Sequence, residues 1–390
     1  MGSGIRSYRV RRPVTDTRGP ALTPADVAGL YHLERFHAQG IYGQGLRIGF
    51  VEFALPSSRD DAAFWSRYSL CPGLNTPARA TLLPRMHPDP SGLGETDLDL
   101  QYAGALAPGA DLRVYVVDDR LPLAGFLPAL WGALRAAAAD GVRIVSISLG
   151  GGDAEVARSG AITDPGGGAS WADATAFAAA LDDWVRAHGM LCFVSSGDNG
   201  AYAAFPSDMA VQASWPATQG AFIAVGGTQL AVPGDPASGE EAWGGQTGDP
   251  TAPGYTAANT LGQASGGGGA SVFVPAPGHQ AGLATTARTT PDVAAFAGPL
   301  VVVDRGTETP VWGTSASAPI VAAIAALYRQ ATGRDLDHPL LYGSARDVTA
   351  GNNWNDALAQ AGLTAFAAAA PGYDACTGMG TPDAAGLPGV

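Results

Sequence analysis

The stretch VWGTSASAPIVAAIAALY, residues 311–328, combines a turn with the start of a helix. Gly, Thr, two Ser and Pro fall close together, and an apolar, alanine-rich run follows them up to Gly333, a residue type that commonly ends helices. Ser315 would lie in the first turn of this helix, where backbone N–H groups and the helix dipole favour anionic species. The stretch therefore predicts a helix that presents a serine at its amino end.

Apolar strands alternate with helix-like stretches on the amino-terminal side of this helix. Such alternation predicts an α/β fold, in which helices cover both faces of a largely parallel sheet. In such sheets the functional site lies beyond the carboxyl ends of the strands. The expected strands are LRIGFVEF (46–53), DLRVYVVD (111–118), GVRIVSISLG (141–150), MLCFVSSGD (190–198) and AFIAVGG (221–227), and the main expected helices span 123–141 and 171–189.

One domain is the simplest organisation for the 390 residues, because no internal repeat and no linker stand out. We expect residues 1–22 to be an irregular tail and residues 23–390 to form a single domain. Met1–Gly4 fits either a remnant of expression cloning or a chain whose native start was removed. A first helix is expected after Thr23, an N-cap residue that is followed by proline. The glycine-rich segment 231–275 predicts long surface loops.

The composition bounds the function. The net charge is −13 and lysine is absent, so a nucleic-acid partner is not expected. No apolar run reaches the roughly 18 residues of a membrane span, and no secretory signal opens the chain. The lysine-free composition, rich in Ala, Gly and Arg, fits a GC-rich genome, and the acidic balance fits work at low pH. Three cysteines, Cys71, Cys192 and Cys376, contain no CxxC pair, and their disulfide status stays open.

The pattern Gly-Thr-Ser-x-x-x-Pro at the start of a helix resembles the turn in which a subtilisin-type protease presents its nucleophilic serine. Such a serine needs a base to take its proton. None of the six histidines lies in a glycine-rich motif that opens a helix, where a subtilisin-type histidine would be found. Carboxylates are the alternative: Glu95 and Asp99 are four residues apart on an expected helix, so they share one face. Asp198 follows the strand MLCFVSS at a turn of small residues. Alone, each acid is more typical of a solvated helix face or a turn.

Together, in this order, the four residues resemble the sedolisin family of serine-carboxyl peptidases, and its kumamolisin-like members in particular. The resemblance runs from about Thr23 to the end of the chain. It implies a subtilisin-like fold that carries a Ser-Glu-Asp triad and acts in acid. The stretches that carry it are TPADVAGLY, GETDLDLQYAGALAPGADLRVYVV, IVSISLGG, SSGDNG, SWPAT, FIAVGGTQL, TPDVAAFA, GTSASAP and PGYDACTGMGTP.

The resemblance assigns a role to each catalytic residue. Ser315 would be the nucleophile, Glu95 its base, and Asp99 the group that orients Glu95 and shares its proton. Asp198, kept protonated in acid, would donate to the oxyanion. Glu52, at the end of an expected strand, would extend the acidic network.

One structural Ca²⁺ ion near the carboxyl terminus is also implied by the resemblance. Its ligands would be the Asp347 and Asp374 side chains and the carbonyls of Val348, Ala370 and Gly372. Oxygen ligands from two irregular loops suit this cation.

Two departures from the family concern the expected substrate cleft, to which we assign Leu149, Gly150 and Ser214. Leu149 replaces a usual tryptophan. Ser214 replaces an aspartate that is associated with basic P1 residues in kumamolisin, so a preference for Arg or Lys at P1 is less expected here.

The sequence therefore predicts a monomeric endopeptidase that binds peptide or protein substrates. An exopeptidase, or a peptide-processing or transpeptidating enzyme on the same scaffold, is the main alternative. A binding-only homologue and an ordinary Ser-His-Asp protease are weaker ones. The family usually carries a long prodomain, and we expect none before Thr23. An extracellular location is implied by the resemblance alone.

Overall fold

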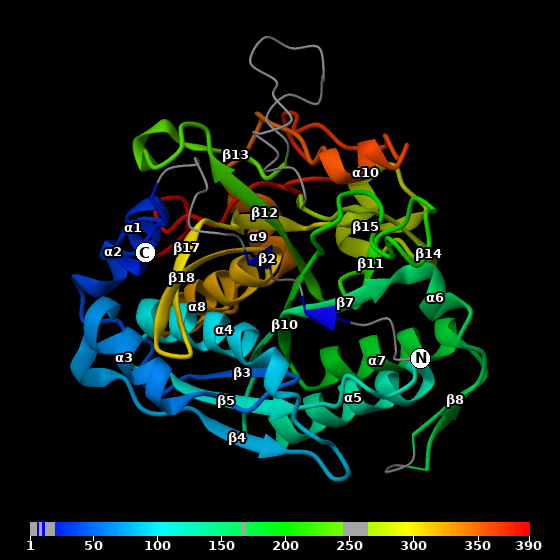
Figure 1. The fold of residues 1–390 in the computed structure, drawn as a ribbon, viewed down its shortest axis with the longest axis horizontal. Coiled ribbons are helices and arrows are strands. Elements are labelled where there is room, and N and C mark those ends of the chain that lie inside the picture. The colour runs from blue at the N-terminus through cyan, green and yellow to red at the C-terminus, as the bar shows by residue number, and fades with distance from the viewer. Residues whose placement is uncertain (1–5, 8–9, 12–19, 165–167, 245–263) are drawn as a thin grey trace.

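The computed structural model of the protein describes residues 6–7, 10–11, 20–164, 168–244 and 264–390. A central sheet dominates it, with the strand order β13-β12-β10-β6-β3-β5-β4 and with β16 also paired to β12 (Figure 1). Every pairing in this sheet is parallel except that of β12 with β13. Its strands are β3 (Arg47–Glu52), β4 (Arg79–Leu82), β5 (Asp111–Val116), β6 (Ile144–Ile147), β10 (Leu191–Ser195), β12 (Ile223–Leu230), β13 (Glu240–Ala242) and β16 (Val293–Phe296).

The two faces of this sheet belong to two separate apolar cores, because successive side chains of a strand point to opposite faces. In β3, Ile48 and Phe50 pack with one core, whereas Val51 packs with the other. Helices α1 (Pro24–Leu30), α3 (Ser58–Tyr68), α4 (Leu93–Leu106) and α8 (Thr314–Thr332) cover the first face, and α5 (Leu123–Ala139) and α7 (Ala174–Ala187) cover the second. The expected α/β architecture, with helices on both faces, is confirmed (Figure 1).

Helix α8 runs through the first core, in the middle of the molecule (Figure 1). All of its residues from Thr314 to Tyr328 are buried, and its C-cap is Gly333 in the left-handed conformation, as expected. Helix α4 packs directly against α8. Thr23 caps α1 as expected, through a capping box with Asp26. No helix within the described ranges is long and apolar enough to cross a membrane.

The remaining elements are short pieces at the rim and the carboxyl-terminal side. The segment expected to be an irregular tail contains β1 (Arg6–Ser7) and β2 (Val10–Arg11), because free edges of β7 and β18 offer partners to its backbone. The other elements are α2 (Glu34–His37), β7 (Leu149–Gly152), α6 (Asp153–Ala157), β8 (Ile162–Thr163), β9 (Ser170–Trp171), β11 (Ser214–Trp215), β14 (Gly269–Pro275), β15 (Ala287–Thr290), β17 (Leu300–Asp304), β18 (Thr307–Trp312), α9 (His338–Ser344) and α10 (Asp356–Gln360).

The glycine-rich segment 231–275 is less irregular than expected. It contributes β13 to the edge of the main sheet and β14 to a hairpin with β15. Residues 245–263 of this segment lie outside the described residues. All three cysteines are free thiols, so the open question of a disulfide is answered for this structure.

Candidate active site

Ser315 lies where strand β18 turns into helix α8. Gly313 makes the turn with a φ of 146°, a backbone conformation that residues with a side chain rarely adopt. The side chain of Ser315 is fully buried, and its Oγ donates to the backbone carbonyl of Ser148 at 3.4 Å. The serine therefore occupies the amino end of a helix that is buried from Thr314 to Tyr328.

Three carboxyl groups are buried beside this serine. Glu95 and Asp99 come from α4, which packs against α8, and Glu52 comes from the end of β3. Their residues are 4%, 0% and 2% exposed, respectively. Asp99 accepts a hydrogen bond from the Ser148 hydroxyl at 2.7 Å, and Glu52 accepts one from the Thr96 hydroxyl at 3.3 Å. The pair expected on one helix face thus points into the protein rather than into solvent.

Burial and crowding act together on the protonation of these acids. Burial raises the pKa of Asp99 well above its usual range, and the charges of Glu52 and Glu95 raise it further, while the Ser148 hydrogen bond opposes them. Burial likewise raises the pKa of Glu52, with Glu95 as the next cause. These carboxyl groups are therefore close enough to one another to titrate as a coupled group rather than singly.

Asp198 lies just after the carboxyl end of β10, and β10 pairs with β6 in the central sheet. Its Oδ1 accepts two hydrogen bonds from Thr314, at 2.9 Å from the backbone N–H and at 2.8 Å from the hydroxyl. The Thr314 hydroxyl in turn accepts the N–H of Gly197 at 3.1 Å. Because Thr314 immediately precedes Ser315, the structure brings Asp198 to the same helix end.

The six histidines all contact other groups of the described chain. Within the described residues none of the six hydrogen-bonds to Ser315. Their nearest polar partners are Asp383 for His32, Leu106 O for His37, Asp118 for His87, Trp184 O for His188, Asp292 for His279 and Phe222 O for His338.

His279, Asp292 and His338 form a cluster whose ligand atoms lie within 4.8 Å of one another. The two imidazole rings stack, with centroids 3.8 Å apart and planes 16° from parallel. A metal ion must lie in the plane of each imidazole that binds it, so two stacked rings cannot share one ion. The Asp292 carboxylate is also paired with the buried Arg288, at 2.6 Å from Nη1 to Oδ1. In this arrangement the Asp292 carboxylate is held by its ion pair with Arg288, and the two rings are not placed to bind one ion between them.

Comparisons with known proteins place this geometry in a family. Residues 93–356, which include Glu95, Asp99, Asp198 and Ser315, match the family model described as "Subtilase family". The chain belongs to the subtilase family.

Two curated relatives of this subtilase extend over most of its length. Kumamolisin of Bacillus sp. (strain MN-32) is 32% identical over 93% of the chain, and sedolisin of Pseudomonas sp. (strain 101) is 29% identical over 77%. The chain spans 62% of kumamolisin and 49% of sedolisin. The resemblance to sedolisins that the motifs indicate is therefore confirmed.

Two further matches differ in kind. The tripeptidyl-peptidase sed1 of Aspergillus fumigatus is 38% identical over 25% of the chain and 15% of its own length. The solved structure of Pseudomonas sedolisin, in complex with two molecules of pseudo-iodotyrostatin, has a TM-score of 0.68, with coverage of 93% of this chain and 96% of that one. At 22% identity this second match establishes the fold, and it confirms the expected subtilisin-like architecture.

The expected substrate-cleft residues of the subtilase lie on β7 and β11. Leu149 and Gly150 belong to β7, which has β11 on one side and β1 on the other. The register pairs Arg6 with Gly150 and Ser7 with Leu149 in antiparallel orientation. Ser214, on β11, is fully buried and pairs with Gly152. The outer edge of β7 is thus taken by the subtilase's own amino-terminal segment.

The carboxyl-terminal loops of the subtilase bring the expected calcium ligands close to one another. The Asp347 carboxylate accepts the N–H of Gly372 at 2.8 Å, and the Asp374 carboxylate accepts the N–H of Ala370 at 3.0 Å. The Thr377 hydroxyl joins the Val348 carbonyl to Asp374 at 3.3 and 3.1 Å. The two carboxylates and the Val348 carbonyl are oxygen donors, the type that Ca²⁺ prefers, whereas Ala370 and Gly372 contact the carboxylates through their N–H groups.

Two residues of the subtilase's candidate site, Ser148 and Thr314, were not predicted from the sequence. Ser148 joins Asp99 to Ser315, and Thr314 holds Asp198. Each stands beside a residue that was singled out, Leu149 and Ser315. The available signal was the position of Ser148, a polar residue at the carboxyl end of a buried strand, where α/β sheets place functional groups.

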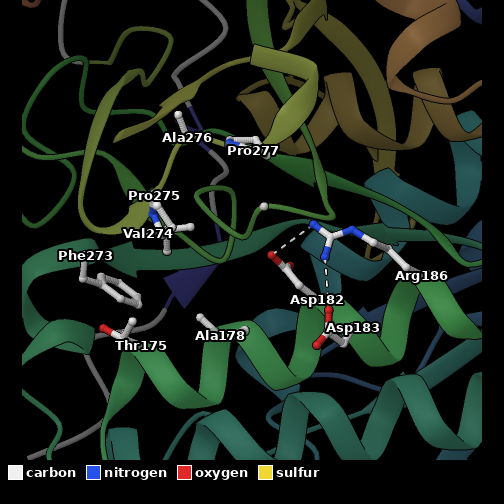
Figure 2. A pocket seen from close by; sticks show the side chains of 12 residues that line it. Thr175, Ala178, Asp182, Asp183, Arg186, Phe273, Val274, Pro275, Ala276 and Pro277 are labelled. Atoms are coloured by element: carbon white, nitrogen blue, oxygen red, sulfur yellow. Dashed lines mark hydrogen bonds and ion pairs between the residues drawn. The ribbon is translucent and has the colours of Figure 1, made fainter. Parts of the chain in front are cut away.

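A separate cavity of about 250 Å³ lies between α7 and β14 (Figure 2). Phe273 and Val274 of β14 face Thr175 and Ala178 of α7 across it. At its other end Arg186 lies 3.5 Å from Asp182, and Figure 2 shows this pair at the rim. None of the four candidate catalytic residues lines this cavity, so it is not the candidate site.

Proposed function

We propose that this chain is a serine-carboxyl peptidase, which hydrolyses peptide bonds in acid. The observation that carries the proposal is that Ser148 contacts both Ser315 and Asp99. The backbone carbonyl of Ser148 accepts a hydrogen bond from the Ser315 hydroxyl, and the Ser148 hydroxyl donates one to Asp99. We infer that carboxyl groups take the place of histidine in this site. The family membership and the similarity to kumamolisin and sedolisin support it.

Each residue has a definite part in the proposed reaction. Ser315 Oγ attacks the peptide carbonyl while Glu95 takes its proton, and the C–N bond then breaks as Glu95 returns that proton to the leaving amine. Water, activated by Glu95, then cleaves the acyl ester and regenerates the serine. Asp99 orients Glu95 and shares its proton. The charge of Glu52 raises the pKa of Asp99.

The backbone of β7 offers a place for the substrate. A peptide that displaces β1 could pair with Leu149 and Gly150 as an antiparallel strand, the mode in which extended peptides add to sheet edges. We propose an endopeptidase, acting as a monomer outside the cell, with an unfolded protein or peptide as its partner. The similarity to a tripeptidyl-peptidase favours the exopeptidase alternative.

The proposal is tested by incubating the full chain with an unfolded protein at several pH values between about 3 and 8 and identifying the products by mass spectrometry. We expect cleavage to peak in acid, because the site uses carboxyl groups. Internal cuts would support an endopeptidase, and serial release of tripeptides would support the alternative. A maximum at neutral or alkaline pH would contradict the proposed base.

Asp198 is proposed to donate to the oxyanion, a role that requires its protonated form. Asp198→Ala should lower kcat by roughly 10²–10³-fold, the usual cost of losing one such donor. Asp198→Asn should lose less, because its amide can donate while its oxygen still accepts from Thr314. Equal losses in steady-state kinetics of the two variants would contradict the donor role.

Calcium is proposed at the Asp347–Asp374 loops, where the ion would stabilise segments with little apolar core. Removing it with a chelator near neutral pH should lower the melting temperature by about 5–10 °C. Asp347→Asn should melt at the lower temperature with or without chelator. Asp183→Asn, an exposed aspartate of α7, should keep the response of the unaltered chain. If the melting temperature of the unaltered chain did not change on addition of the chelator, the calcium site would be excluded.

A further inference from the structure

Ser148 occupies the point where three parts of the site meet. It follows β6 and precedes β7, and only 1% of its surface is exposed. Its hydroxyl oxygen lies 2.7 Å from Asp99 Oδ2 and 3.2 Å from the backbone carbonyl of Ser315. Its own carbonyl accepts the Ser315 hydroxyl at 3.4 Å. One residue therefore contacts both the carboxyl pair and the nucleophile.

The direction of the Ser148 hydrogen bond follows from its partners. A serine hydroxyl has one proton to donate, and a carboxyl oxygen at 2.7 Å competes better for it than a carbonyl at 3.2 Å. Asp99 Oδ2 is then an acceptor, so the proton that Asp99 carries in acid must reside on Oδ1. The other acids around Asp99 are Glu52 from β3 and Glu95 from its own helix.

We propose that Ser148 is a positioning residue of the reaction: its hydroxyl fixes which oxygen of Asp99 holds the shared proton, and its backbone holds the nucleophile in register with that pair. This inference rests on the proposed function. Within the described residues, Ser148 is the only residue whose hydroxyl hydrogen-bonds to Asp99, so no neighbouring residue can fix the proton of Asp99 in this way.

The pH dependence of such a role has a definite sign. The Ser148 hydrogen bond stabilises the ionised form of Asp99 and so lowers the pKa of that group against burial and the charges of Glu52 and Glu95. Its loss raises this pKa, and the carboxyl pair then loses its negative charge at a higher pH. Because Glu95 can accept a proton only while the pair is charged, activity should begin to fall at a higher pH on the acid side.

The structure supplies a matched control two residues earlier, inside strand β6. Ser146 is fully buried, and its hydroxyl has no hydrogen-bond partner among the described residues. Ser146→Ala therefore removes a buried hydroxyl without removing a hydrogen bond. Any general effect of truncating a serine in this strand should appear in it.

The experiment compares the unaltered chain with Ser148→Ala, Ser148→Thr and Ser146→Ala. Ser148→Ala should lose about 10- to 100-fold in kcat, the effect of one hydrogen bond to an ionised group, with little change in KM. The acid limb of its kcat profile should move to higher pH. Ser148→Thr, which keeps the hydroxyl, should keep the position of the limb even where its extra methyl lowers kcat. Ser146→Ala should match the unaltered chain in both.

A second readout separates this inference from the peptidase activity. Carbon-13 NMR of carboxyl-labelled aspartate, with the Asp99 signal assigned by its loss in Asp99→Asn, reports the titration of Asp99 directly. We expect the midpoint to rise in Ser148→Ala and to stay in place in Ser146→Ala. An unchanged midpoint in Ser148→Ala, or an equal shift in both variants, would overturn the role of Ser148. An unaltered chain that cleaves nothing would instead contradict the proposed function, while the NMR shift would still establish that Ser148 directs the proton.

Discussion

Replacing Ser315 with alanine should reduce proteolysis by about 10⁴-fold or more, because the acyl-enzyme can no longer form and only binding and oxyanion contacts remain. The substitution removes one hydroxyl whose visible partner is the Ser148 carbonyl, so the fold should persist. The measurement is kcat/KM on a fluorogenic peptide at acid pH, with circular dichroism to confirm folding. Mass spectrometry after acid quenching should detect the acyl adduct on the unaltered chain only.

Ser317→Ala is the matched control for this variant. Ser317 lies two residues further along α8, is equally buried, and donates to the carbonyl of Ala295 at 2.8 Å. Its loss should cost no more than about tenfold, the range expected for one neutral hydrogen bond. Retention of more than about one hundredth of the activity in Ser315→Ala would mean that another residue is the nucleophile.

Replacing Glu95 with glutamine should lower kcat by about 10²–10⁴-fold, the usual contribution of a general base. Glutamine keeps the size of the side chain in a site where Glu95 is 4% exposed, so packing changes little. The loss should be present across the pH range, because an amide accepts no proton at any of these values. Kinetics from pH about 3 to 8 measure it.

Asp61→Asn provides a comparison with a buried carboxyl outside the triad. Asp61 is 1% exposed on α3, and burial, with the charge of Asp97 next, raises its pKa as it does for the catalytic acids. Its substitution should leave kcat within a few-fold. If the single substitution of any of the six histidines abolished activity while Glu95→Gln did not, a histidine-based protease would replace the proposed one.

The alternation of strands and helices was readable from the sequence, because buried parallel strands are short apolar runs and the covering helices are amphipathic. The five expected strands and α8 are all present, although the ends of several strands differ from the expected ones by two or three residues. The β1 and β2 pairings could not be predicted, because two-residue strands in an arginine-rich tail carry no periodicity and depend on edges formed by distant residues.

The candidate site divides in the same way. Glu95 and Asp99 share a helix, so their spacing alone put them on one face, and the motif around Ser315 marked the turn. The contacts that join these pieces run between residues 49, 116 and 167 positions apart, through Ser148 and Thr314. No local pattern encodes such contacts, since they depend on how α8 packs against the strands β6 and β10. The roles of Asp198 and Glu52 came only from the resemblance.

The buried acids also tie the stability of the fold to its surroundings. An unfolded chain ionises its Asp and Glu side chains near pH 4, whereas burial keeps protons on Glu52 and Asp99 to higher pH. Their contribution to the free energy of unfolding is thus complete below about pH 4 and is lost as the pH rises through their raised pKa values.

Asp292 has the opposite sign. Burial alone would raise its pKa, but the Arg288 guanidinium outweighs burial and holds it well below the usual range, so its contribution is lost only in stronger acid. As the pH rises above about 4, the Glu52–Asp99 group should therefore make the chain progressively easier to unfold in urea, and Asp99→Asn should weaken that trend. Because the shifts of Glu52 and Asp99 run against that of Asp292, we expect the fold to resist unfolding best in mild acid and to lose part of that resistance as its surroundings become less acidic.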